Sequence, residues 1–478
     1  KEMVPPKTRY TYEVVVVVNN KVINLPRCIS SIYEQQNLDF EHINITILDL
    51  GATSEQIEYI SSLADNVRVY SANDELAYLS FISSLQLNYT LFLWGDDFLD
   101  MSFIQSTDKF LLSDPKKNRR GSIICTSVLT ANSNSEIGRN YNPITALYSK
   151  LPADDVLPEQ MVVESIYGCF FPSGVLKAIM RKQGGFYCLK FDGVGIFFDI
   201  FRSIPDTRRL TISGKSKYLV HEENISHPFK ENFWDESVLY TEYFILLCDK
   251  FHSNIAGSKK WQELLRRSFL YILLKYMKKG LANQSLLDNI DSAEKDAFIN
   301  ALKSSLELIG TNSINKFNVA CAEQFKVGCL NFIEKGRVSS AVDILQYDLD
   351  KDMFMLRYYT PSFMPEYFMM GNMDLIPIVD KNISHNLFGQ TFFIERVVWL
   401  SVTKEIMSSQ LSINLDGKNI KIRGFDKKVV NSISPIAIKK QFNTIKPKFN
   451  FSSKYRNAWI FMDRDNQADD NAEHLYRY

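Results

Sequence analysis

Four aspartates and one histidine have side chains suited to chemistry: Asp49, Asp96, Asp97, Asp199 and His221. Adjacent carboxylates can hold a divalent cation, Mg²⁺ or Mn²⁺, and the cation neutralises a bound diphosphate. A single carboxylate can accept hydrogen bonds from a ribose or remove the proton of an acceptor hydroxyl. Taken one at a time, each aspartate is more often an ordinary turn or cap residue. The case for a site therefore depends on where the fold places them.

The first hundred residues alternate between buried strands and helices. Residues 13–18 form a continuous run rich in β-branched side chains, typical of a strand buried on both faces of a parallel sheet. The other predicted strands are residues 43–49, 67–70 and 91–94, and the predicted helices are residues 25–36, capped by Asn24, and a helix capped by Ser54. This order predicts a mainly parallel sheet with helices on its faces.

The carboxyl ends of parallel strands meet at one edge of a sheet, where such sheets bind ligands. Asp49 ends the second predicted strand, and Asp96 and Asp97 follow the fourth. The sequence therefore predicts that these three carboxylates converge on one cleft.

The chain has 478 residues, which is too long for one hydrophobic core. Residues 1–233 are predicted to form the α/β domain. Residues 234–370 are predicted to be a helical region, because apolar residues recur there at helical spacing. Residues 371–455 are predicted to be a small strand-rich connector with a hairpin turn at Asp416-Gly417. Residues 456–478 are expected to begin a further domain.

Charge and cysteine content exclude several classes of protein. Lys plus Arg and Asp plus Glu number 55 each, so no net charge draws the chain to nucleic acid. The seven cysteines lack metal-ligand spacing and are odd in number, which argues against a disulfide framework and fits a reducing cytoplasm. The sequence shows no run of about 18 apolar residues that would span a bilayer. We expect a cytoplasmic protein, and homo-oligomers are left open.

The basic stretch at residues 259–279 has two interpretations. It could lie on the anionic cytoplasmic face of the inner membrane, where lipid-linked acceptors reside. The sequence favours a core helix with a solvated basic face.

Several segments carry a family resemblance. They are Val14-Val-Val-Val-Val-Asn-Asn20, Leu25-Pro-Arg-Cys-Ile-Ser-Ser-Ile-Tyr-Glu-Gln-Gln36, Ile45-Thr-Ile-Leu-Asp-Leu-Gly-Ala-Thr-Ser54, Leu93-Trp-Gly-Asp-Asp97 and Tyr218-Leu-Val-His-Glu-Glu-Asn-Ile-Ser226. Over residues 12–230 the chain resembles the family-2 glycosyltransferases, which have the GT-A fold. Their second acidic motif commonly reads Leu-Asp-Ser-Asp-Asp, so Trp94 stands in place of its first aspartate.

The resemblance implies a role for each candidate residue, together with a nucleotide sugar donor and a divalent cation. The implied nucleotide contacts are Asn19, Asp49 and Asp96, the implied metal ligands are Asp96, Asp97 and His221, and the implied catalytic base is Asp199, with Asp192 as a competitor.

The end of the chain carries a second, shorter resemblance. Residues 459–478 are similar to the opening strand, loop and helix of the CDP-glycerol-type glycerophosphotransferase domains of teichoic-acid and capsule polymerases. We therefore expect the natural protein to continue, and the alternative is a genuine C-terminal helix.

The resemblances together predict an inverting glycosyltransferase within a multidomain capsule polymerase. It would move a sugar from a nucleotide diphosphate sugar to a growing polysaccharide or a glycerol-phosphate-type acceptor. The alternative is a degenerate GT-A module that binds glycan or scaffolds the downstream domain. Trp94 favours this alternative, whereas Asp96, Asp97 and His221 favour activity.

Overall fold

The computed structural model describes residues 10–36, 40–63, 67–71, 80–81, 83–113, 121–131, 143–153, 156–183, 194–204, 208–221, 240–256, 259–282 and 290–445. The chain divides into two compact units. The first consists of Lys1–Ser339, Tyr359–Met364 and Asn382–Arg396, and the second consists of Ser340–Tyr358, Pro365–Lys381 and Val397–Tyr478.

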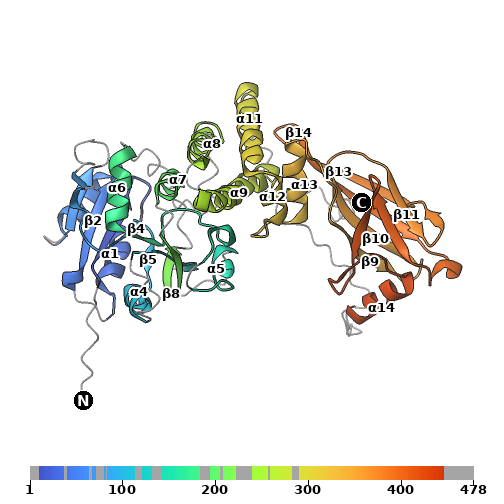
Figure 1. Ribbon diagram of the computed structural model, residues 1–478, viewed down its shortest axis with the longest axis horizontal. Coiled ribbons are helices and arrows are strands. Elements are labelled where there is room, and N and C mark those ends of the chain that lie inside the picture. The colour runs from blue at the N-terminus through green and yellow to red at the C-terminus, as the bar shows by residue number, and fades with distance from the viewer. Residues whose placement is uncertain are drawn as a thin grey trace, which may run out of the picture. The chain divides into compact units, whose positions relative to one another are not determined.

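The first unit is built on an eight-stranded sheet with the order β3-β2-β1-β4-β7-β6-β8-β5 (Figure 1). Its strands are β1 Tyr12–Val18, β2 Ile43–Asp49, β3 Val67–Ser71, β4 Tyr89–Trp94, β5 Phe98–Leu99, β6 Ile123–Ala131, β7 Cys169–Pro172 and β8 Leu210–His221. Strands β3, β2, β1 and β4 are mutually parallel, and β6 pairs with β8 in parallel. Strand β7 is antiparallel to β4 and β6, and β5 is antiparallel to β8. The predicted α/β fold class with a mainly parallel sheet is confirmed.

Strand β1 lies in the middle of the parallel part of the sheet. All seven of its residues are buried, as expected for a strand that has neighbours on both sides and helices on both faces. Figure 1 shows α1 and α6 beside this part of the sheet. The helices of this unit up to residue 203 are α1 Leu25–Tyr33, α2 Ser54–Ser61, α4 Phe103–Leu112, α5 Pro143–Tyr148, α6 Ser173–Gln183 and α7 Val194–Ser203.

One predicted helix cap is in place and the other is wrong. Asn24 is the N-cap residue of α1, but its side chain makes no cap bond; the backbone N–H of Asn24 donates instead to the carboxylate of Asp96. Helix α2 is capped by Thr53, and Ser54 is its first helical residue. Thr53 and Gln56 form a reciprocal capping box, which satisfies two backbone N–H groups at once.

The helical region follows, and α8, α9 and α11 appear as green to yellow coils in Figure 1. Its helices are α8 Glu242–Ile255, α9 Lys259–Ala282, α11 Ser292–Ile309, α12 Thr311–Lys316 and α13 Glu323–Phe332. Helix α9 contains the basic stretch, and its apolar stripe, with Phe269 and Tyr276, is buried in the core. The preferred interpretation of a core helix therefore agrees with the structure. Among the described residues, no helix combines the length and apolarity needed to cross a membrane.

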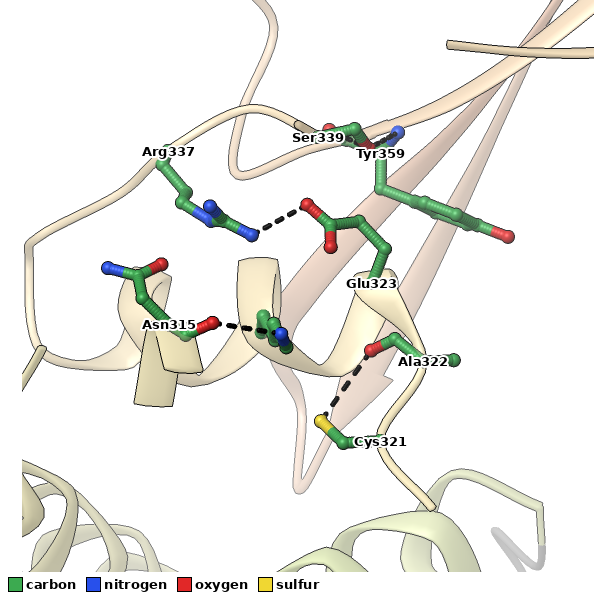
Figure 2. A network of polar contacts seen from close by, with 8 residues as sticks. Asn315, Cys321, Ala322, Glu323, Arg337, Ser339 and Tyr359 are labelled. Carbon is green, nitrogen blue, oxygen red and sulfur yellow. Dashed lines mark hydrogen bonds and ion pairs between the residues drawn. The ribbon is translucent and has the colours of Figure 1, made fainter. Parts of the chain in front are cut away.

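Polar contacts hold the end of the helical region (Figure 2). An ion pair of 2.6 Å joins Arg337 to Glu323 at the start of α13. The backbone N–H of Ser339 donates to the carbonyl of Tyr359, and the N–H of Tyr359 donates to the Ser339 hydroxyl.

The strands of the second sheet begin earlier than the sequence predicts. Strand β9 starts at Ala341, whereas the sequence places the strand-rich connector from residue 371 onward. The runs at 341–348 and 353–360 mix Leu and Met with β-branched residues, so their period does not separate strand from helix.

The second sheet has nine strands in the order β12-β11-β15-β16-β9-β10-β14-β13, and β17 pairs with β16. Its strands, together with the helix that follows them, are β9 Ala341–Asp348, β10 Met353–Thr360, β11 Glu366–Met370, β12 Met373–Leu375, β13 Val379–Leu387, β14 Gln390–Ser401, β15 Leu411–Leu415, β16 Lys418–Arg423, β17 Val429–Val430 and α14 Pro435–Ile445. The predicted hairpin is confirmed: β15 and β16 are joined by Asp416 and Gly417, with φ of 52° and 75°. Positive φ at both positions is what a type I′ turn requires.

Candidate functional site

The carboxyl ends of β1, β2 and β4 lie side by side. Val18, the last residue of β1, pairs with Asp49, and Val17 pairs with Trp94. The chain runs from β1 outward to β2 and β3, whereas β4 lies on the other side of β1. The topological switch point therefore falls between β1 and β4, and open α/β sheets bind ligands at this position. Asn19 follows β1 at the same edge.

Asp49 closes a tight turn at the end of β2. Its Oδ1 accepts hydrogen bonds from the backbone N–H of Gly51 at 2.8 Å and of Ala52 at 2.6 Å. Gly51 has a φ of +114°, a conformation that favours glycine. The turn leads into α2, and the Asp49 side chain stays half-buried. This carboxylate can still receive a hydroxyl group, because an ionised carboxylate has about four acceptor positions.

Gln56 connects this turn to the loop after β1. Its side-chain amide donates to the carbonyls of Asn19 at 3.1 Å and Val22 at 2.6 Å. The Asn19 side chain accepts from the N–H of Lys21 at 2.9 Å. Gln56 thus holds the loop at residues 19–24 from the β2 side, a role that the sequence does not predict. The capping-box spacing of Thr53 and Gln56 could have drawn attention to it.

Asp96 holds the same loop from the β4 side. Only 1% of its surface is exposed. Its Oδ1 accepts from the backbone N–H of Ile23 at 2.6 Å and of Asn24 at 2.5 Å. A carboxylate placed at the start of α1 also meets the positive end of the helix dipole. Asp49 and Asp96 therefore lie on either side of the loop at residues 19–24.

Asp97 lies fully buried and is bonded to β8. Its Oδ2 accepts from the Tyr218 hydroxyl at 2.6 Å, and the same hydroxyl oxygen accepts from the N–H of Trp94 at 3.1 Å. Burial, together with the charge of Asp97, raises the pKa of Tyr218 well above its usual value. The hydroxyl therefore keeps the proton that it donates. The sequence names Tyr218 only as the first residue of a motif, so its hydrogen bond to Asp97 is a second contact of the site that the sequence does not predict.

Trp94 fills the position where the resembled motif has an aspartate. Its side chain is fully buried, and its ring lies edge-on to that of Tyr167, with centroids 5.9 Å apart. The Cys28 thiol contacts the Trp94 carbonyl at 3.6 Å. Burial raises the pKa of Cys28, and the carboxylates of Asp97 and Asp96 act in the same direction. At the end of β4 the structure therefore has an aromatic contact between Trp94 and Tyr167, where the resembled motif has a carboxylate.

The remaining candidates are placed only in part. Asp199 lies in α7 and His221 ends β8, but their side chains are outside the described residues, as is all of Asp192. The register that pairs Ala131 with His221 brings the end of β8 to the edge where β6 ends. The end of the chain from residue 446, with its resemblance to a glycerophosphotransferase, is likewise outside them.

The described side chains do not assemble a metal site. Among them, no group of three or more His, Cys, Asp or Glu residues could hold a cation. Asp96 and Asp97 are buried, and each carboxylate accepts a hydrogen bond from the protein itself.

The sequence predicts that Asp49, Asp96 and Asp97 face one cleft. The structure places them on one edge, where only Asp49 is half-exposed.

The parallel half-sheet, with its acidic residues at one edge, defines an open α/β domain. No known protein family matches the sequence, and no curated protein matches it. Among solved structures, the chain is similar to S. aureus TarS, with 9% identity and a TM-score of 0.47, covering 86% of this chain and 77% of that one. A structure of S. aureus TarS 1-349 in complex with UDP-GlcNAc has 11% identity and a TM-score of 0.47, covering 68% and 88%. The mannosyltransferase PcManGT from Pyrobaculum calidifontis, in complex with GDP-Man and Mn²⁺, has 12% identity and a TM-score of 0.36, covering 63% and 77%.

Proposed function

We propose that the chain is a glycosyltransferase that transfers a sugar from a nucleotide diphosphate sugar to an acceptor hydroxyl. One observation carries the proposal: Asp49 and Asp96 flank the loop at residues 19–24 at the switch point of the sheet. In this proposal a nucleotide binds here with its ribose hydroxyls on Asp49 and its phosphates near the loop backbone, as in other open α/β sheets. The sequence resemblance to family-2 glycosyltransferases supports the sugar as the transferred group.

The proposed transfer inverts the anomeric carbon. The acceptor oxygen forms a bond to this carbon while the bond to the diphosphate breaks, and the acceptor proton passes to Asp199. Asp49 and Asn19 hold the nucleoside, and Asp96 keeps the loop in place. A divalent cation on Asp96, Asp97 and His221 would supply charge neutralisation when bound. The proposed acceptor is a capsular or teichoic-acid-like polymer with sugar or glycerol-phosphate units.

A second candidate function is a degenerate module that binds glycan or scaffolds a further domain. The specific observation in its favour is that Trp94 is buried against Tyr167 and that one oxygen of each carboxylate, Asp96 Oδ1 and Asp97 Oδ2, accepts hydrogen bonds from the protein. In this case the acidic pair stabilises the loop after β1 and the end of β8. No donor would then bind.

Calorimetric titration separates the two candidates. The protein is titrated with UDP-, GDP- and CDP-linked sugars in Mn²⁺ or Mg²⁺, and release of nucleoside diphosphate is then followed for any donor that binds. The proposal predicts saturable heat with at least one donor, followed by diphosphate release. Absence of binding to every donor, with the protein folded by circular dichroism, would favour the degenerate module.

A further inference from the structure

Gln56 uses its whole side-chain amide to hold backbone groups. The amide nitrogen donates to the carbonyl of Val22 at 2.6 Å and to that of Asn19 at 3.1 Å. The amide oxygen accepts from the backbone N–H of Thr53 at 2.6 Å. Since a glutamine amide carries two N–H donors, both are committed to the loop at residues 19–24, while its oxygen serves the start of α2.

The bonds of Gln56 complete a bridge across the ends of β2, β1 and β4. On the β2 side, its partner Thr53 directly follows the turn that the Asp49 carboxylate closes. On the β4 side, the carboxylate of Asp96 accepts from the last two N–H groups of the loop. Carbonyls of the loop thus face a donor and its N–H groups face an acceptor, so the loop backbone is fixed in one orientation.

A close apolar contact also locates the loop. The side chain of Val22 is buried and lies against Gly95, which directly precedes Asp96. A Cβ atom at Gly95 would come within 2.9 Å of Val22 Cγ1 and 3.1 Å of the Val17 carbonyl oxygen, so only glycine permits this approach. Val22 therefore has little room to shift, and Gln56 bonds the carbonyl of this same residue.

We propose that Gln56 is a positioning residue that sets the affinity for the nucleotide sugar and takes no part in the transfer itself. It keeps the loop at residues 19–24 and the Asp49 turn in the arrangement that receives the nucleoside. A site that is competent for only part of the time binds its ligand more weakly by that fraction. The inference rests on the proposed function, in which Asp49 and Asn19 hold the nucleoside.

Two substitutions of Gln56 separate the loop contacts from the helix cap. Gln56→Met keeps the length of the side chain and removes all three bonds of the amide. Gln56→Glu keeps an oxygen for the N–H of Thr53 but turns a carboxylate toward the carbonyls of Asn19 and Val22. If Gln56 served only the capping box, Glu would replace it, because Glu and Gln both serve at this position. The positioning role predicts that both variants fail.

The experiment measures hydrogen–deuterium exchange of the free full chain, and then binding and turnover of UDP-, GDP- and CDP-linked sugars. Residues 19–24 should exchange faster in both variants than in the wild-type protein. The Kd of a donor that binds the wild-type protein should rise about tenfold, a factor that the loss of one or two neutral hydrogen bonds supplies. The rate at saturating donor should change by less than about twofold, because only binding common to the ground state and the transition state is lost.

Gln35→Met is the matched control. The Gln35 amide also donates to two backbone carbonyls, those of Ser31 and Asp100, and accepts from the N–H of Ile104. These three partners lie outside the loop at residues 19–24. The control variant should lower the melting temperature and leave both the exchange of the loop and the Kd of the donor unchanged.

Three results would overturn the role of Gln56 and leave the proposed transferase in place. They are unchanged exchange of residues 19–24 in Gln56→Met, wild-type affinity for the donor in Gln56→Glu, and an equal loss of affinity in Gln35→Met, which would point to general destabilisation. A wild-type protein that binds no donor would instead reject the proposed function, and the role of Gln56 in donor affinity would fall with it.

Discussion

At the scale of single residues, Asp96 shows why a motif does not reveal the state of its side chains. The sequence pattern suggests a pair of exposed turn carboxylates. In the folded chain Asp96 is buried and bonded to Ile23 and Asn24, which are 73 and 72 positions away. A contact over such a separation depends on the strand order. The position of the acids on the sheet edge was predictable, but their burial was not.

Asp96 should therefore respond differently to two substitutions. Asp96→Asn keeps an oxygen for the N–H groups of Ile23 and Asn24, so the free energy of unfolding should fall by less than about 1 kcal/mol. Asp96→Ala leaves both donors without this acceptor and should cost about 1–3 kcal/mol. Urea unfolding measures the difference. Both variants should lose affinity for a nucleotide sugar, and equal stability of the two would contradict the loop-holding role.

Tyr218 provides a second test at this scale. Tyr218→Phe removes the hydroxyl that bonds the buried carboxylate of Asp97, so the free energy of unfolding should fall by about 1.5–3 kcal/mol. Tyr148→Phe is the matched control, since its hydroxyl donates to a neutral carbonyl, and it should cost about 0.5–1.5 kcal/mol. Urea unfolding of both variants checks the order. A smaller loss for Tyr218→Phe would mean that Asp97 is held in another way.

At the scale of elements, buried strands were the easiest to predict. The run at residues 13–18 and the strand at 91–94 lie inside β1 and β4, because β-branched and aromatic side chains fit a doubly covered sheet. Helix starts were harder. Thr53 and Ser54 are adjacent and equally able to cap, so the choice between them depends on the preceding Asp49 turn.

The contact between α8 and α11 should make a pH-dependent contribution to stability. His252 lies 2.9 Å from the Ser305 hydroxyl. Burial lowers the pKa of His252, and Asp249 partly opposes this. The imidazole of His252 thus binds a proton near the ordinary histidine pKa of about 6.5 in the unfolded chain, but only at a lower pH in the folded chain. Stability should fall as the pH drops through this value toward the lower, folded pKa.

The measurement is urea unfolding of wild type and His252→Gln at pH 7.5 and pH 5.5. The fall in stability between these pH values should be smaller in the variant, because the titrating group is gone. An equal fall in both proteins would show that other groups account for the acid dependence.

At the scale of the whole molecule, the chain crosses between its two units more than once. Residues 382–396 belong to the first unit, although they follow strands of the second. The rings of Phe388 and Phe298 are tilted against each other with centroids 4.4 Å apart, and those of Phe392 and Phe332 have centroids 5.0 Å apart. The sequence predicts domains that follow one another along the chain. The pattern of hydrophobic residues indicates which local segments form helices and strands, but it does not indicate which distant segment packs against a given helix.

A chain that ends at Ser339 should therefore be less stable than one that ends at Ile445. Its helices would lose the cover of Phe388 and Phe392 and expose apolar surface. Burying one such side chain is worth roughly 1.5–3 kcal/mol. Thermal unfolding and light scattering should show a lower melting temperature and more aggregation for the shorter chain. Equal melting temperatures would mean that residues 382–396 add nothing to the first unit.

The central claim is that a nucleotide sugar binds at the switch point of the first sheet. Hydrogen–deuterium exchange with and without a saturating donor tests this claim most directly. In the wild-type protein we predict that the donor slows exchange in the segments at residues 19–24, 49–53 and 94–97. In the Asp96→Ala variant we predict that adding the donor leaves the exchange of these segments unchanged. Protection confined to other segments, or unchanged exchange at these three while the donor is demonstrably bound, would contradict the account.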